Sequence, residues 1–359
     1  PPSSGYAFET PPDTGSSSWA PRDGDRIAFV GDTFIEREQR SGYVETALTL
    51  ANPGKSITFR NLGWSGDTVA GLSRAGFDPP EAGFKQLIDQ VFAVNPSLIV
   101  IGYGGNESFA GQAGLETFSK GLIRLIESLR PTHARFILLA PLKQEKLGAS
   151  LPDPTKHNQD VALYSQAIRS IAQKVGAGFL ELDPFEGREL SPGRTPLTDN
   201  GIHLTDLGYW TLATQLHAIH RPRETFSGSS TGVLGSSGGV QVSLSRSDCS
   251  PWRVSRIEMT PTVVRFKVES ASLPLPPRPG TATSENIAPS PDTPVLTVAG
   301  LSTGSYRLLI DGQTVLSASG EELGKGIACP YGPDAARSEE LRQTIVKKNE
   351  LFFHRWRPQ

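Results

Sequence analysis

Residues 26–33 read Arg-Ile-Ala-Phe-Val-Gly-Asp-Thr, a short apolar run that stops at a glycine and two polar residues. Four more runs of strand length follow, at residues 56–63, 97–102, 136–140 and 179–182. Nearly all five are continuously apolar rather than alternating, which indicates burial on both faces and therefore a parallel sheet. Segments with helical spacing separate or follow the runs, at residues 43–51, 84–94, 115–129, 161–175 and 207–220.

This alternation predicts an α/β domain in which helices cover a five-stranded parallel sheet. Such sheets bind their ligands at the carboxyl ends of the strands. We therefore expect the functional residues of this chain to lie in the loops that follow the strands.

The pattern along the chain predicts five parts. They are an N-terminal arm at 1–24, the α/β domain at 25–222, a Gly/Ser linker at 223–240, a small antiparallel β-sandwich-like domain at 241–318, and a helical tail at 319–359. The β-domain is indicated by short strands of period two and by the hairpin turn Asp311-Gly312. The tail is dense in aromatic and basic residues, and we expect it to pack back on the body.

Composition excludes several classes of function. The net charge of −2 and the sequence pI of about 6.4 argue against nucleic acid as a partner. Apolar runs are too short to span a membrane, for which about 18 residues are needed. Cys249 and Cys329 cannot form a metal cluster alone, and no histidine pair has ligand spacing, so we expect no metal and no cofactor. One disulfide or two thiols remain equally open, and the oligomeric state is not predicted.

Four polar segments fall where such a sheet binds ligands. They are Gly-Asp-Thr at 31–33, Asn-Leu-Gly-Trp-Ser-Gly-Asp-Thr at 61–68, Gly-Gly-Asn-Glu at 104–107 and Asp-Asn-Gly-Ile-His at 199–203. Their order and spacing over about residues 25–220 resemble the SGNH (GDSL-type) hydrolase family, exported bacterial members included. The resemblance implies a three-layer, flavodoxin-like α/β domain and hydrolysis of esters by an activated hydroxyl.

The resemblance also implies a role for each matching position. Thr33 stands at the nucleophile, His203 at the base and Asn200 at the residue that orients the base, with Asp199 as a possible substitute for Asn200. The backbone N–H of the nucleophile, the N–H of Gly66 and the amide of Asn106 stand at the oxyanion hole.

Two of these positions depart from the family pattern. Threonine replaces serine at 33, and its methyl group restricts χ1 and crowds the path of attack. Asparagine replaces aspartate at 200, and it cannot stabilise an imidazolium by charge. In a serine protease the corresponding Asp→Asn change costs about 10⁴ in kcat.

The remaining polar residues of these segments have structural and functional interpretations. Asp32 is expected to cap or brace the first loop, Glu107 to brace the third, and Trp64 either to pack in the loop or to stack on a sugar ring.

Three functions stay open at this point. The first is an ester hydrolase that removes an acyl group such as acetate from a carbohydrate, with a small molecule or glycan as substrate. The second is a catalytically silent, glycan-binding module of the same fold. The third is a glycosidase whose acid and base come from Asp32, Asp67, Glu107 and Asp199. The family resemblance places the protein outside the bacterial cytoplasm.

Overall fold

A computed structural model describes most of the chain. The described residues are 20–148, 151–185, 194–220, 232–237, 240–245, 253–260, 262–269, 273–280, 295–329 and 333–357. Most of the expected N-terminal arm, residues 1–19, lies outside these ranges, and so does Cys249, one of the two cysteines for which a disulfide and free thiols are equally open. The chain forms two compact units: Pro1–Arg37 with Lys55–Asp183, and Glu38–Gly54 with Pro184–Gln359.

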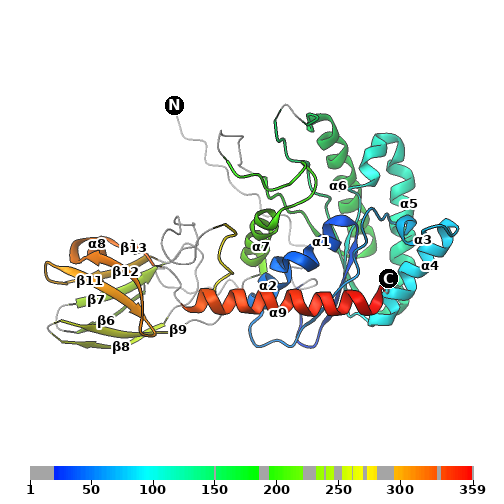
Figure 1. Ribbon diagram of the computed structural model, residues 1–359. Helices are drawn as coiled ribbons and strands as arrows, with labels where there is room; N and C mark the ends of the chain where they lie inside the picture. Colours follow the sequence, from blue (N-terminus) through cyan, green and yellow to red (C-terminus); the bar gives the residue numbers. More distant parts are fainter. Residues whose placement is uncertain are drawn as a thin grey trace. The chain divides into compact units, whose positions relative to one another are not determined.

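The first unit is built on the predicted parallel sheet (Figure 1). Its strands are β1 (Arg26–Gly31), β2 (Thr58–Asn61), β3 (Leu98–Gly102), β4 (Arg135–Leu139) and β5 (Gly178–Leu180). They are parallel throughout and lie in the order β2-β1-β3-β4-β5. All five positions of β3 are buried, as its continuous apolar run predicts.

Helices of this unit pack along the sheet and against one another. They are α3 (Leu72–Ala75), α4 (Pro80–Val94), α5 (Gly111–Leu129) and α6 (Thr155–Val175), with the short 3₁₀ helices η1 (Glu107–Ala110) and η2 (Arg130–Thr132). The helix α4 begins four residues before the apolar repeat does, because Pro80 is well suited to the first turn of a helix.

Helix α1 (Thr33–Ser41) follows β1 directly and was not predicted. Its sequence, Thr-Phe-Ile-Glu-Arg-Glu-Gln-Arg-Ser, has too few apolar residues for a visible helical repeat. The first turn of the helix is ordered by a cap from Asp32, the residue that precedes it.

The second unit contains helices α2 (Tyr43–Leu50) and α7 (Asp206–His220), which pack against each other. Small antiparallel sheets accompany them. Strands β13 (Ile327–Ala328), β10 (Val295–Ala299), β7 (Val240–Ser245) and β6 (Gly232–Ser237) form one sheet, and β8 (Arg253–Met259) with β9 (Val264–Glu269) and β11 (Ser305–Ile310) with β12 (Gln313–Ser319) form two hairpins. They share an apolar core around Val242, Leu296 and Val298, to which Cys329 also belongs.

Two segments of this unit differ from expectation. Part of the predicted Gly/Ser linker is strand β6, because its backbone pairs with β7. The predicted tail also contributes helix α8 (Gly320–Lys325) and strand β13 to the β-rich part before the long helix α9 (Pro333–Trp356) begins. Helix α9 packs on α2, in agreement with the expected return of the tail to the body. Within the described part of the chain, no helix has the length and apolarity that crossing a membrane requires.

Candidate active site

The first polar segment forms the junction between β1 and α1. Asp32 precedes the helix, and its carboxylate accepts a hydrogen bond of 3.0 Å from the N–H of Phe34. Its carbonyl oxygen accepts the N–H of Glu36 at 3.0 Å. Asp32 is therefore the N-cap of α1, a helix that was not predicted. Thr33 is the first residue of the helix, where the N-terminal end of the helix dipole favours negative charge.

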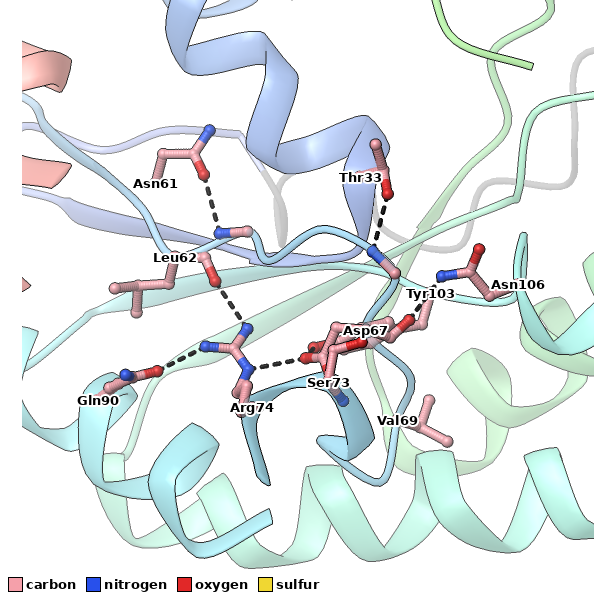
Figure 2. Close-up of polar contacts among 12 residues, drawn as sticks. Thr33, Asn61, Leu62, Asp67, Val69, Ser73, Arg74, Gln90, Tyr103 and Asn106 are labelled. Atoms are coloured by element: carbon pink, nitrogen blue, oxygen red, sulfur yellow. Dashed lines mark hydrogen bonds and ion pairs between the residues drawn. The ribbon is translucent and has the colours of Figure 1, made fainter. Parts of the chain in front are cut away.

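The second segment packs closely on the start of α1. The side chain of Asn61 donates to the carbonyl of Ile35 at 2.6 Å. Its oxygen accepts the N–H of Gly63 at 2.9 Å (Figure 2). A Cβ at Gly63 would lie 2.3 Å from the backbone nitrogen of Glu36, so only glycine allows this approach. The loop is thereby held against the helix that carries Thr33.

This packing brings Gly66 to Thr33. The N–H of Gly66 donates to Oγ1 of Thr33 at 2.9 Å (Figure 2). Gly66 has a φ of +69°, a conformation that favours glycine. Two of the predicted site residues, from segments more than thirty positions apart, are therefore in direct contact.

A buried ion pair lies beneath the same loop. Nε of Arg74 lies 2.7 Å from Oδ2 of Asp67, and both side chains are fully buried. The hydroxyl of Tyr103 donates to the same carboxylate oxygen at 2.8 Å. Arg74 also donates to the carbonyl of Leu62 at 2.8 Å and to the side chain of Gln90 at 2.5 Å (Figure 2). The guanidinium therefore ties both ends of the loop to α4.

The third segment lies across from this loop. The side-chain amide of Asn106 donates to the carbonyl of Asp67 at 2.8 Å. Glu107 accepts the N–H groups of Val69 at 2.8 Å and Gly104 at 2.9 Å, which confirms that it braces the loop. Asn106 thus lies beside the loop that presents Gly66 to Thr33.

Asp32, Asp67 and Glu107 are all engaged in the scaffold of the site. Burial raises the pKa of Asp32 to about 7, and the charges of Glu107 and Asp67 add to this rise. Burial also raises the pKa of Glu107. Because Asp32 caps a helix, Asp67 pairs with Arg74 and Glu107 holds two backbone N–H groups, the glycosidase alternative finds no uncommitted pair among these three.

The fourth segment belongs to the second unit and forms a tight turn before α7. The N–H of Asp199 donates to the carbonyl of His203 at 2.9 Å, which closes the turn. Oδ1 of Asn200 accepts the N–H groups of Ile202 at 3.1 Å and His203 at 2.9 Å. Nδ2 of Asn200 lies 3.1 Å from Nδ1 of His203, and Oδ1 of Asp199 lies 3.8 Å from the same nitrogen.

The predicted site residues therefore fall into two groups. Thr33, Gly66, Asn106, Asp32 and Glu107 are brought together in the first unit, and His203, Asn200 and Asp199 in the second. Trp64 is half-buried in the second segment, with the guanidinium carbon of Arg74 5.3 Å from its ring centroid.

An aromatic pair beside Asn106 was not anticipated from the sequence. The ring of Phe109 stacks on the imidazole of His157, with 4.1 Å between ring centroids and 25° between planes. Phe109 nevertheless remains 63% exposed. Its N–H donates to the carbonyl of Asn106 at 3.3 Å, so the exposed ring is anchored to the third segment. The position of Phe109, two residues after Glu107 of the third segment, is the sequence signal that could have drawn attention to it.

Comparison with known proteins identifies the family of the chain. The sequence profile of the GDSL-like lipase/acylhydrolase family matches residues 24–211, which is more than half of the chain. The rice (Oryza sativa subsp. japonica) protein GDSL esterase/lipase WDL1 is 26% identical over 143 residues, covering 34% of this chain and 54% of that protein. The chain therefore spans about half the length of this curated relative.

A solved structure shows the same fold over most of the chain. A gut microbial diltiazem-metabolizing enzyme superimposes with a TM-score of 0.67 at 18% identity, covering 95% of this chain and 81% of that one. An acetylxylan esterase from Geobacillus stearothermophilus gives a TM-score of 0.42 at 19% identity, covering 55% of this chain and 94% of that one. At such low identity the likeness of the first structure extends to the fold alone.

Proposed function

Because this chain belongs to the GDSL-like lipase/acylhydrolase family, we propose that it hydrolyses acyl esters with Thr33 as the nucleophile. The observation that carries the proposal is the contact between the N–H of Gly66 and the hydroxyl of Thr33, with Asn106 alongside. A hydroxyl surrounded by preformed N–H donors is what acyl transfer requires, because negative charge develops on the carbonyl oxygen during attack.

In the proposed reaction, Oγ1 of Thr33 attacks the ester carbonyl while His203 takes the hydroxyl proton. The N–H groups of Thr33 and Gly66 and the amide of Asn106 hold the tetrahedral oxyanion. Collapse of this intermediate releases the alcohol, which takes the proton from His203, and leaves an acyl-threonine. Water, deprotonated by His203, then hydrolyses the acyl-threonine and returns the hydroxyl to Thr33.

Hydrolysis of nitrophenyl acetate by four proteins tests this proposal. We expect slow turnover by the parent, loss of turnover in Thr33→Ala and His203→Ala, and faster turnover in Thr33→Ser, because serine lacks the crowding methyl group. Thr344→Ala, an exposed threonine of α9, is the matched control and is expected to keep the parent rate. Turnover by Thr33→Ala at the rate of the control would contradict the proposal.

We further propose that the alcohol part of the ester is a carbohydrate and that the acyl group is small, such as acetate. The exposed face of Phe109 supports this, since its other face is covered by His157 and its backbone is bonded to Asn106. An aromatic face in this position suits the apolar face of a sugar ring.

Two substrates, one with a sugar ring and one without, test whether Phe109 stacks on a sugar ring. Phe109→Ala is expected to raise KM for an acetylated oligosaccharide by roughly three- to tenfold, the worth of one stacking contact. KM for ethyl acetate, which has no ring, is expected to stay unchanged. Phe92→Ala removes another exposed ring, from α4, and serves as the control. Equal effects of Phe109→Ala on both substrates would count against carbohydrate recognition by this ring.

Export from a bacterial cell is the setting that the family resemblance implies for this protein, and we retain it as a proposal. Fractionation of the source cells tests it directly. Recovery of the protein from the cytoplasmic fraction alone would contradict it.

A further inference from the structure

The orientation of the Asn200 side chain is fixed by its own turn. Its Oδ1 accepts two backbone N–H groups, from Ile202 at 3.1 Å and His203 at 2.9 Å. Rotating the amide by half a turn would place the NH₂ group against these two donors and lose both hydrogen bonds. The side chain therefore presents its NH₂ group, and not its oxygen, to the ring of His203.

This orientation determines where neutral His203 carries its proton. Nδ2 of Asn200 lies 3.1 Å from Nδ1 of His203, and an amide NH₂ is a donor only. Nδ1 must accept this hydrogen bond, so the proton of the neutral ring stands on Nε2. We propose that Asn200 holds His203 in the Nε2–H tautomer, so that the resting protein presents a hydrogen-bond donor where the reaction needs a base.

The inference deepens the proposed function, in which His203 takes the proton of Thr33. To act as that base through Nε2, the ring must first carry its proton on Nδ1, opposite a group that accepts it. An aspartate at position 200 would accept the backbone N–H groups with one oxygen and Nδ1–H with the other. In a serine protease the wrong tautomer accounts for the loss that follows Asp→Asn.

Asp199 is the residue that makes the base tautomer accessible. Its Oδ1 lies 3.8 Å from Nδ1 of His203, so a small rotation brings it to hydrogen-bond distance. The base tautomer exchanges the Asn200 contact for an Asp199 contact and places two donors, Nδ1–H and Nδ2–H, near each other. The approach of these two donors disfavours the base tautomer, which therefore remains the minor form of the neutral ring.

Imidazole nitrogen NMR tests the tautomer without any substrate. With ¹⁵N-labelled histidine, a protonated nitrogen and an unprotonated nitrogen of a neutral ring have well-separated shifts, and His203→Gln identifies the two signals by their loss. We expect neutral His203 to show an unprotonated Nδ1 and a protonated Nε2. In Asn200→Asp we expect the two assignments to exchange. A protonated Nδ1 in the parent would overturn the inference.

Kinetics test the consequence for catalysis. Asn200→Asp is expected to raise kcat for nitrophenyl acetate by at least about 100-fold, towards the 10⁴ that separates the two residues in a protease triad. Asp199→Asn in the parent is expected to lower the residual rate. The same change added to Asn200→Asp is expected to alter the rate of that variant by no more than about twofold. Asn95→Asp, the same chemical change at the exposed end of α4, is the control. An unchanged kcat in Asn200→Asp, in a protein that does hydrolyse the ester, would overturn the catalytic consequence.

The two experiments separate this inference from the proposed function. An Nε2–H ring in a protein with no hydrolysis in any variant supports the tautomer and contradicts the esterase. Hydrolysis by a protein whose ring is Nδ1–H supports the esterase and contradicts the tautomer.

Discussion

Asp32 is a carboxyl group that the fold buries at the start of α1, and burial raises its pKa from 3.8 to about 7. Between these two values the folded protein binds more protons at this position than the unfolded chain does. The free energy of unfolding therefore falls as pH rises through this window. Asp32→Asn keeps an oxygen for the N–H of Phe34 but cannot ionise. We expect the variant to lose less stability between pH 5 and pH 7, by up to about 1.4 kcal/mol per pH unit, in urea unfolding.

The matched control for this measurement is Asp89→Asn, which removes an exposed carboxylate paired with Lys85. It is expected to follow the parent at each pH. Burial also raises the pKa of Glu38, to about 8, so Glu38 makes stability fall with pH in the same direction. The dependence of stability on pH is therefore reduced in Asp32→Asn but not abolished. Parallel curves for the parent and Asp32→Asn would show that the carboxyl does not gain protons on folding.

At the scale of single residues, the sequence predicts the location of those residues that directly follow a strand. Thr33, Gly66 and Asn106 each come shortly after a strand of a parallel sheet, and such positions gather at one edge. Arg74 and Phe109 were missed because their importance depends on the partner that packing brings to them. Nothing in the local sequence says that Arg74 will meet Asp67 in a buried pair.

At the scale of elements, the loop between β2 and α3 is held by that buried pair. Arg74→Met leaves the carboxylate of Asp67 buried without its guanidinium, and we expect it to lower the free energy of unfolding by about 3–5 kcal/mol. The double variant Asp67→Leu/Arg74→Met removes both charges, and it is expected to recover most of this loss. Urea unfolding measures both.

The double variant also separates stability from positioning. Without the carboxylate of Asp67, the hydroxyl of Tyr103 loses its acceptor, and the carbonyl of Leu62 loses the donor that Arg74 supplied. We therefore expect kcat for nitrophenyl acetate to be below that of the parent in the double variant, even though its stability is largely restored. A double variant with both stability and kcat restored would show that the pair does not position the loop that carries Gly66.

Elements were predicted wherever hydrophobic spacing alone defines them. Strands β1 and β3 are continuously apolar because nearly all of their positions are buried, and this pattern is visible in the sequence. Helix α1 was missed because it is mostly polar and owes its start to the cap at Asp32. Strand β6 was missed because pairing of its backbone with β7, rather than its Gly/Ser composition, makes it a strand.

At the scale of the whole molecule, a local sequence pattern does not predict to which compact unit helix α2 belongs. Its residues, 43–50, come between β1 and β2 in the chain, yet they belong to the compact unit that holds residues 184–359. The reason is packing: α2 contacts α7 and α9, whose residues come some 150 to 300 positions later. Hydrophobic spacing predicts that α2 is a helix, but it carries no information on which distant helix covers it.

The contact between α9 and α2 gives the last prediction. The guanidinium of Arg342 donates to the carbonyl of Ser41, lies 4.5 Å from the ring centroid of Tyr43 and is 9% exposed. Arg342→Ala removes a charged hydrogen bond and a cation–π contact, and we expect a loss of about 2–4 kcal/mol in urea unfolding. Arg337→Ala, which breaks an exposed ion pair with Asp334 on the same helix, is expected to cost less than about 1 kcal/mol.

Hydrogen exchange locates the effect of Arg342→Ala. Because α9 packs on α2, the amides of residues 43–50 should lose protection in Arg342→Ala and keep it in Arg337→Ala. Unchanged protection of α2 in both variants would mean that Arg342 does not hold the two helices together.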